Sequence, residues 1–319
     1  MKVYDIAGLG ASTLDRFIKV RKFPTGREVQ EVVESANDGG GPVSTALAVA
    51  GKFGANVVML DRIGDDMTGR TILEDFKIYN VHTDGVEVVG GTISGCATIF
   101  VETESGKRAI FFERSTAPEY GESDLVRDLI TDSKILHING RHRQALLPAI
   151  KSAKKAHTLV SFDGGANRYE SSLDEIMAHI DICIVARDFG EKYTGETDLM
   201  KACYSIHEKG ALIAGVTDGA NGSYFVWPDG TEYRCAAYSQ DTIVDTTGCG
   251  DSFHGAFLYG LTQWGTIDEQ GILDLQHTPN EILEACAKLA SAVGALNTRQ
   301  LGGRSGLPTL DAAKQLANI

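Results

Sequence analysis

The part of the sequence best suited to chemistry is a glycine cluster that runs directly into an aspartate, IVDTTGCGDSFHGAFLYG at residues 243–260. Gly248 and Gly250 allow a tight turn that points several N–H groups one way, and a helical pattern begins near Asp251. Such a helix N-terminus binds anions through its unpaired N–H groups and the helix dipole. Asp251 is then either a residue that complements the dipole or a general base beside a bound phosphoryl group. The residues alone leave both roles open.

Two further segments carry residues that suit ligand binding. The segment VTDGANGS at residues 216–223 contains an Asn-Gly turn whose free N–H groups are able to contact phosphate. Asp15 follows the first strand-like run. A carboxylate accepts two hydroxyl hydrogen bonds at once, which suits a polyol; the alternative for Asp15 is a solvated turn residue.

The elements that must position these residues alternate along the chain. Short apolar runs ending in Gly, Asp or Asn predict strands at 3–10, 56–64, 134–140, 157–165, 181–186 and 211–219. Helical patterns lie between them at 44–53, 69–79, 143–156, 172–179, 188–193 and 198–209. Three more helices are expected at 251–264, 280–298 and 310–317. This alternation predicts a single α/β domain over residues 1–319, with a mostly parallel sheet covered by helices on both faces.

Two segments interrupt that rhythm, Thr13–Ser35 and Thr92–Thr116. Both alternate polar and apolar residues, as in RFIKVRKF, EVQEVVES, GCATIFVET and KRAIFFER. Such alternation is typical of strands with one buried face. We expect the two segments to pair into a small antiparallel sheet outside the main one; the alternative is that they form edge strands of the main sheet.

Composition excludes several classes of protein. The chain has 319 residues, 30 basic and 43 acidic, and a net charge of −13 without any basic run. Binding to nucleic acid or to an anionic membrane is therefore not expected. No apolar stretch approaches the roughly 18 residues of a transmembrane helix, and the start MKVYDIAGLG predicts a first strand. Six dispersed cysteines without a CxxC pair favour reduced thiols and a cytoplasmic location over disulfides or zinc.

The segment DTTGCGD at 245–251 resembles the D-T-x-G-x-G-D signature of the ribokinase-like (PfkB-type) carbohydrate kinases. The run GGPVSTA at 40–46, with the residues that follow it, resembles that family's N-terminal signature; those residues are Gly54, Gly64, Asp65 and Gly69. This resemblance implies a Rossmann-like core with a small β-sheet lid over a sugar site, and a homodimer formed through the lids. It also implies ATP-dependent phosphorylation of a primary hydroxyl of a small sugar.

The resemblance also assigns roles to single residues on the phosphate side. Asp251 falls on the catalytic base, which takes the proton from the attacking hydroxyl. The anion hole that holds the γ-phosphate falls on Gly248, Cys249 and Gly250, with Cys249 where alanine is usual. The nucleotide-binding positions fall on Thr217, Gly219, Gly222 and Ser291.

On the sugar side, Asp15 matches the residue that binds sugar hydroxyls, and Gly40 and Gly41 match the pair that lets the backbone approach the sugar. Thr45 stands where the family usually has asparagine, so the sugar preference of ribokinase does not transfer. Arg141 in ILHINGRH resembles a substrate arginine of the ketohexokinase and sulfofructose-kinase-like branch. It could bind hydroxyls, hold an anionic group, or be a surface residue.

Metal binding is the point at which the chain departs from the family. The family's N-x-x-E motif, which organises Mg²⁺, is missing at ARDFGE, residues 186–191. Asp188 and Glu191 could take the place of its two residues. Mg²⁺ is still expected, because ATP itself brings most of the ligands. Asp245 and Thr247 match positions near a K⁺ site in relatives.

The substrate that this reading favours is a fructose-like ketose. One alternative is a kinase for a nucleoside, an aldopentose or a 2-keto-3-deoxy sugar acid on the same fold. A second alternative is a catalytically silent sensor of a sugar or nucleotide.

Overall fold

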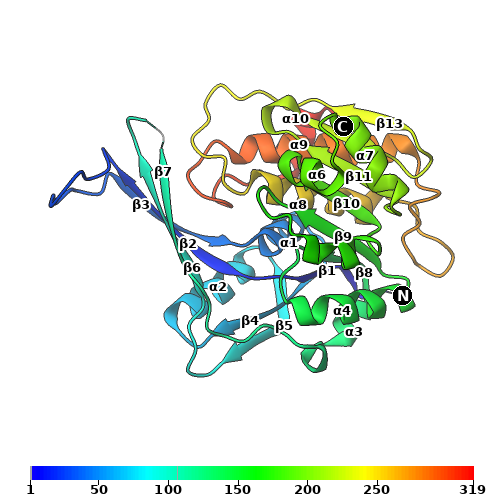
Figure 1. The fold of residues 1–319 in the computed structure, drawn as a ribbon, viewed down its shortest axis with the longest axis horizontal. Helices are drawn as coiled ribbons and strands as arrows, with labels where there is room; N and C mark the ends of the chain where they lie inside the picture. The colour runs from blue at the N-terminus through cyan, green and yellow to red at the C-terminus, as the bar shows by residue number, and fades with distance from the viewer. Residues whose placement is uncertain (1, 106) are drawn as a thin grey trace.

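A nine-stranded sheet forms the centre of the protein in the computed structural model, which describes residues 2–105 and 107–319 (Figure 1). Its strands lie in the order β13-β12-β11-β10-β9-β8-β1-β4-β5. Their bounds are β1 Tyr4–Leu9, β4 Val57–Gly64, β5 Val81–Val89, β8 Ser133–Ile138, β9 Leu159–Gly164, β10 Ile182–Ala186, β11 Ile213–Thr217, β12 Ser223–Val226 and β13 Glu232–Cys235. The pairs from β5 to β11 are parallel, and β12 and β13 continue the sheet antiparallel. The predicted parallel sheet is confirmed.

Helices cover both faces of this sheet, as its strands require. Each buried strand sends alternate side chains to opposite cores: in β10, Ile182 and Ile184 join one core while Cys183 and Val185 join the other. The helices are α1 Pro42–Lys52, α2 Met67–Ile78, α3 Arg127–Thr131, α4 Arg143–Lys155, α5 Asp174–Met177, α6 Arg187–Thr194, α7 Leu199–Glu208, α8 Cys249–Trp264, α9 Asn280–Asn297 and α10 Leu310–Ala317. The helix expected at 172–179 is shorter than predicted: a 3₁₀ turn at Ser171–Leu173 leads into the single turn of α5.

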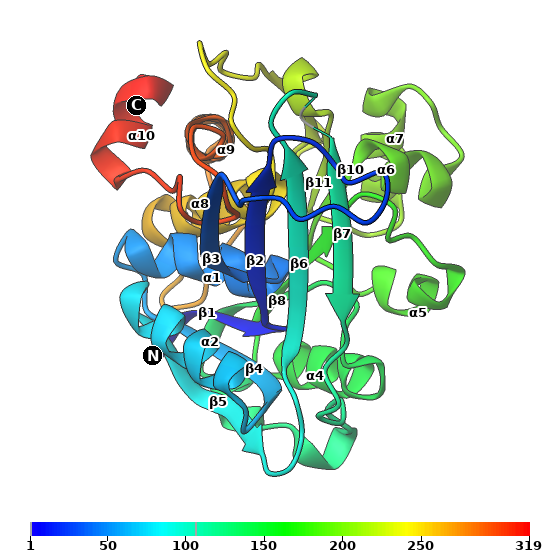
Figure 2. The same cartoon turned by 90° about the vertical axis from the view of Figure 1, so that its left-hand side faces the viewer.

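A second, four-stranded sheet projects from one side of the core (Figures 1 and 2). Its strands lie in the order β3-β2-β6-β7, with bounds β2 Thr13–Val20, β3 Glu34–Gly40, β6 Gly95–Glu102 and β7 Arg108–Glu113. We call this sheet the lid. The expectation of a separate small sheet is confirmed, but a wholly antiparallel arrangement is wrong, because β2 and β6 are parallel. Both follow strands of the parallel main sheet, β1 and β5, and so leave the same edge in the same direction.

One strand boundary in the lid differs from the one predicted from the sequence. Within EVQEVVES, at 28–35, pairing begins only at Glu34, and Val29, Val32 and Val33 are exposed in the preceding loop. A small core of Phe17, Ala97, Ile99, Val101 and Leu301 joins the lid to the loop after α9. The lid therefore stands over the carboxyl edge of the parallel strands, where ligands bind in open α/β sheets.

None of the helices in residues 2–105 and 107–319 is long and apolar enough to cross a membrane. All six cysteines are free; five are buried and Cys249 is half-buried.

Candidate active site

The N-terminus of α8 is an open, uncapped helix end. Gly248 occupies the N-cap position with a φ of 72°, and no side chain caps the helix. A Cβ on Gly248 would overlap the carbonyl oxygen of Gly303, so this position needs glycine for its conformation and for its space. A Cβ on Gly250 would meet nothing within 4 Å. The space beside Gly250 is thus open at an uncapped helix N-terminus, which is an arrangement that binds anions.

Two cavities meet at this helix end. The larger, of about 740 Å³, lies between the lid and the carboxyl edge of the main sheet; the predicted site residues that line it are Asp15, Gly41, Arg141, Thr217, Thr247, Gly248, Gly250 and Asp251. The smaller, of about 540 Å³, is lined by the predicted residues Thr217, Gly219, Gly222, Cys249, Gly250 and Ser291. Thr217 and Gly250 line both cavities. Of the predicted site residues, Gly40, Thr45 and Asp245 line neither.

Asp251 lies at the junction of the cavities, in the first turn of α8. Burial raises the pKa of its carboxyl, and the nearby carboxyl of Asp163 raises the same pKa further. The guanidinium groups of Arg168 and Arg304 oppose this shift. A carboxyl whose pKa is raised toward neutrality binds a proton more strongly than an ordinary aspartate, which suits a general base.

Asp163 at the end of β9 is a second buried carboxyl, and sequence reasoning missed it. Burial raises its pKa, its Oδ1 lies 3.4 Å from His254 Nε2, and its Oδ2 has no hydrogen-bond partner among the described residues. Burial also lowers the pKa of His254 to about 3, so that imidazole is neutral. The available signal was the acidic residue at the carboxyl end of a buried strand, followed by Arg168 in GGANR.

Asp15 faces the larger cavity from β2. Its Oδ1 accepts a hydrogen bond from Thr13 Oγ at 3.1 Å, and burial raises its pKa to about 6. A Cβ on Gly40 would overlap the Asp15 carboxyl, so glycine there leaves room for this side chain. Gly41 has a φ of 95° and forms the N-cap of α1.

Thr45 is turned away from the cavity toward Arg304, in the loop after α9. Arg304 Nε donates to Thr45 Oγ at 3.0 Å, and its Nη2 donates to Ser44 Oγ at 2.6 Å and to the Gly40 carbonyl at 3.2 Å. Arg304 is 2% exposed and also pairs with Asp75 of α2. Thr45 therefore belongs to the scaffold that supports Gly40 and Gly41. The signal for Arg304 was the segment TRQLGGRSGLP, whose partners lie far away in the sequence.

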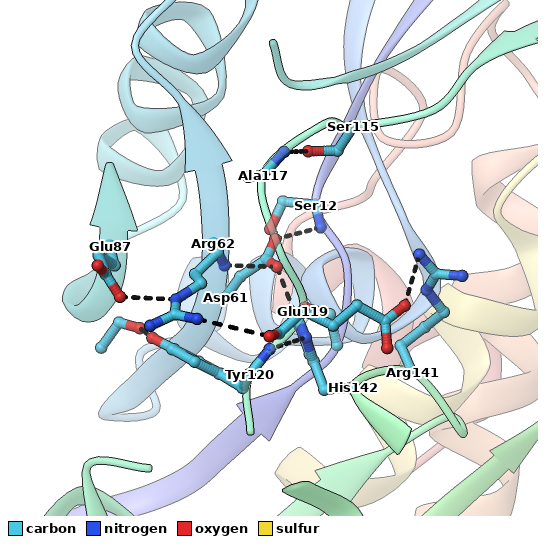
Figure 3. Close-up of polar contacts among 12 residues, drawn as sticks. Ser12, Asp61, Arg62, Glu87, Ser115, Ala117, Glu119, Tyr120, Arg141 and His142 are labelled. Carbon is cyan, nitrogen blue, oxygen red and sulfur yellow. Dashed lines mark hydrogen bonds and ion pairs between the residues drawn. The ribbon is translucent and has the colours of Figure 1, made fainter. Parts of the chain in front are cut away.

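Arg141 lines the larger cavity and is held by a carboxylate. Its Nη2 lies 3.1 Å from Glu119 Oε1, and Figure 3 shows the two side chains facing each other. Arg143 is paired in the same way with Glu170, at 2.5 Å. Two of the three arginines that line this cavity thus carry their own counter-charge.

The loop that carries Arg141 is fixed by His142, which has a φ of 58° and is buried. The Tyr120 N–H donates to His142 Nδ1 at 3.1 Å, so the proton of the neutral ring lies on Nε2. That Nε2 lies 3.0 Å from Asp61 Oδ1 (Figure 3). It also lies 3.2 Å from the Gly10 carbonyl. The chain around Arg141 is therefore tied to the end of β1 and to Asp61 within β4.

The smaller cavity is lined mainly by small and apolar residues, among them two glycines with special backbone conformations. Gly219 and Gly222 have φ values of 53° and 93°, and a Cβ on Gly222 would overlap the Cys235 carbonyl. Ser291 on α9 donates to the Ala236 carbonyl at 2.9 Å. Burial raises the pKa of the Cys249 thiol to about 12, so this side chain is uncharged.

The predicted magnesium stand-ins are engaged elsewhere. Asp188 accepts a hydrogen bond from the Asn167 N–H, Glu191 pairs with Arg187 at 2.9 Å, and neither lines a cavity. Within the described residues, no group of three His, Cys, Asp or Glu side chains could hold a metal ion.

Residues 5–310 match the family described as pfkB family carbohydrate kinase. The chain is 30% identical to Probable fructokinase-5 of Arabidopsis thaliana over 296 residues, covering 87% of each chain. It is 24% identical to the 5-dehydro-2-deoxygluconokinase of Listeria innocua, covering 98% of this chain and 95% of that one. Among solved structures, Arabidopsis thaliana ribokinase complexed with ribose and ATP superposes with a TM-score of 0.80 at 20% identity, covering 99% of both chains. Ribokinase from Giardia lamblia gives 0.83 at 18% identity, covering 98% of this chain and 99% of that one.

Proposed function

The chain belongs to the PfkB family of carbohydrate kinases and is an ATP-dependent sugar kinase, and we propose that it phosphorylates a primary hydroxyl of a neutral ketose. The observation that carries the proposal is the junction at Gly250 between the two cavities. A sugar in the larger cavity and a nucleotide in the smaller one would meet beside Asp251. That is the geometry that in-line phosphoryl transfer requires.

In this proposal Asp251 accepts the proton of the attacking hydroxyl as its oxygen bonds to the γ-phosphorus. The bond from that phosphorus to the β,γ-bridging oxygen breaks, and ADP leaves with the electron pair. The N–H groups at Gly248, Cys249 and Gly250 hold the charge on the transferring phosphoryl group. Loss of one such donor typically costs about 3 kcal/mol of transition-state stabilisation. Asp15 accepts hydrogen bonds from other sugar hydroxyls.

The nucleotide would lie along Thr217, Gly219, Gly222 and Ser291 in the smaller cavity. Mg²⁺ would be bound chiefly by the ATP phosphates and water, since Asp188 and Glu191 have other partners. Bound in that way, the ion would neutralise charge on the phosphates.

The charge of the larger cavity supports a neutral sugar. It is lined by three arginines, Arg141, Arg143 and Arg168, and by five carboxylates, Asp15, Glu119, Asp163, Glu170 and Asp251. Because Glu119 and Glu170 already pair with two of the arginines, little positive charge is left for an anionic substrate.

One observation favours the sugar-acid alternative. None of the ion pairs among the described residues involves Arg168, which lines the cavity and influences the pKa values of both Asp163 and Asp251. An unpaired guanidinium could take the carboxylate of a sugar acid, and the Listeria innocua relative is named for such a substrate. A catalytically silent sensor is disfavoured by the presence of Asp251 beside an uncapped helix end.

ADP release measured across a panel of fructose, ribose, adenosine, 2-keto-3-deoxygluconate and 5-dehydro-2-deoxygluconate tests the substrate. The proposal expects the highest kcat/KM with fructose. Turnover of the sugar acids alone would replace it with the second candidate, and no turnover with any compound would favour the sensor.

The Arg141 variants separate the same alternatives within the site. If Arg141 contacts hydroxyls, Arg141→Lys should keep much of the sugar KM that Arg141→Ala loses. If it clamps an anionic group bidentately, both variants should raise KM nearly alike. Unchanged KM values in both would make Arg141 a surface residue.

The lid is our proposed dimer interface. Phe100, Phe111 and Thr98 share one face of β6 and β7, and Phe111 is 64% exposed. A small sheet with an uncovered apolar face gains stability from a partner, and a second lid would supply one. A monomer in sedimentation at micromolar concentration, with and without sugar, would contradict this. We also propose a cytoplasmic location, consistent with six free cysteines.

A further inference from the structure

A lid arginine reaches the loop that leads into the anion hole. Arg108 is the first residue of β7, and its Nη2 lies 2.7 Å from Asp245 Oδ1. Its Nη1 donates to Thr247 Oγ at 3.1 Å. Asp245 and Thr247 directly precede Gly248, the N-cap of α8. The lid therefore makes a charged contact with the loop before the anion hole, in addition to lining the larger cavity.

Asp245 is a buried carboxylate that ties two loops together. Its side chain is 1% exposed, and its Oδ1 accepts hydrogen bonds from Thr247 N at 2.9 Å and Thr247 Oγ at 2.8 Å. Its Oδ2 accepts from Gly302 N at 3.1 Å, and its own N–H donates to the Thr298 carbonyl at 3.1 Å. A buried carboxylate needs a counter-charge. Among the described residues, Arg108 is its ion-pair partner.

This arrangement disagrees with the monovalent cation that the family resemblance suggests near Asp245 and Thr247. A K⁺ ion bound by the side chains of these two residues would have the Asp245 carboxylate and the Thr247 hydroxyl oxygen as ligands. Here Asp245 Oδ1 and Thr247 Oγ already accept hydrogen bonds from the Arg108 guanidinium. A second cation at the same oxygens would be repelled by the guanidinium and would have to displace its hydrogen bonds. The side chains of Asp245 and Thr247, as they stand, do not fit K⁺.

We propose that Arg108 takes the place of the monovalent cation and that the kinase works without K⁺. The guanidinium balances the charge of Asp245 and fixes Thr247, and through them it holds Gly248 and the first turn of α8 in the anion-binding conformation. Arg108 is thus a positioning residue that acts through Asp245. Arg108 can contact this loop only while the lid is in place. The position of the lid over the sugar is therefore linked to the conformation of the anion hole.

The test compares salts and variants in the sugar-kinase assay, and so rests on the proposed function. At matched ionic strength, wild-type turnover in potassium, sodium and tetramethylammonium chloride should agree within about twofold, because only general screening remains. In tetramethylammonium, Arg108→Ala should lose about 10- to 100-fold, the size expected for loss of a charge-assisted hydrogen bond. Potassium or guanidinium chloride should restore part of that loss. Lys107→Ala removes an adjacent exposed lid charge and should behave as wild type in every salt.

A thermal-unfolding measurement without substrates provides the second readout. Potassium should raise the Tm of Arg108→Ala relative to tetramethylammonium and leave the wild-type Tm unchanged. Strong potassium activation of the wild type, full activity of Arg108→Ala, or rescue by guanidinium with no potassium response in activity or Tm would each overturn the proposal. If no sugar is turned over, the proposed function fails, but the Tm comparison still decides whether Arg108 replaces the ion.

Discussion

The two cavities share Gly250 but are built in different ways. Local glycine turns shape the smaller one and the helix end beside it, where Gly219, Gly222 and Gly248 adopt positive φ values. The larger one is formed by side chains from separate strands and loops, and buried ion pairs hold those segments in place. Backbone recognition needs a local motif, whereas side-chain recognition needs the whole fold. We therefore expect substitutions in the two halves to have different consequences.

The largest effect is expected at the point where the two halves meet. Asp251→Asn should lower kcat by about 10²- to 10⁴-fold, because an amide cannot accept the hydroxyl proton. Binding of ATP and the Tm should remain close to wild type. Turnover by ADP release and ATP binding by calorimetry check this, and a variant that keeps more than a tenth of wild-type turnover would remove Asp251 from the role of base.

The next effect belongs to the glycine turn at the N-terminus of α8. Gly248→Ala introduces a methyl group against the Gly303 carbonyl at a residue with positive φ, so the anion hole should distort and kcat should fall about 10²- to 10³-fold. Gly54→Ala is the matched control: its φ is 100°, its Cβ would meet nothing within 4 Å, and it lines neither cavity. The control should lose stability through backbone strain and keep its kcat. An equal loss of kcat in both variants would show that strain alone is responsible.

Arg304→Met addresses the side-chain-built half. It leaves Asp75 without its arginine and frees Thr45, which should cost about 3 to 5 kcal/mol of unfolding free energy. Because Arg304 supports the glycines beneath the sugar, KM for the sugar should rise more than KM for ATP. Urea unfolding and steady-state kinetics measure the two effects. A larger rise in KM for ATP would show that the two halves are not separable in this way.

A smaller effect is expected in the pH profile. Asp251 must be deprotonated to act as base, so kcat/KM for the sugar should fall as the pH drops through its raised pKa. Asp163→Asn removes the neighbouring negative charge, so that pKa should fall and the acid limb should move to lower pH, by about one unit. Asp251 is also faced by Arg168, Arg304 and Asp15, which this variant leaves unchanged. An acid limb at the same pH in wild type and Asp163→Asn would mean that Asp163 does not influence the pKa of Asp251.

The same contrast explains what could be predicted from the sequence. The glycine cluster before Asp251, the parallel sheet and the separate lid follow from local patterns, and these features are present in the structure. β5 was missed because an edge strand that carries His82, Asp84 and Glu87 has no continuous apolar run. The parallel pairing of β2 with β6 depends on where both segments leave the main sheet, which no local pattern records.

The side-chain contacts of the site could not be predicted from local patterns either, because they join residues far apart in the sequence. Arg304 lies 260 residues from Ser44, and Asp163 reaches Asp251 only because β9 ends beside α8. The contact between Thr45 and Arg304 could not be predicted either. The motif places Thr45 on the helix but does not say which residue its hydroxyl contacts.

The most direct test of the account is a crystal structure of Asp251→Asn with a ketose and a non-hydrolysable ATP analogue. The account predicts the sugar in the larger cavity, with its primary hydroxyl toward residue 251 and other hydroxyls on Asp15. It also predicts the nucleotide in the smaller cavity, with its γ-phosphate at the N–H groups of Gly248–Gly250. A sugar bound with its primary hydroxyl away from residue 251, or a γ-phosphate away from the end of α8, would contradict it.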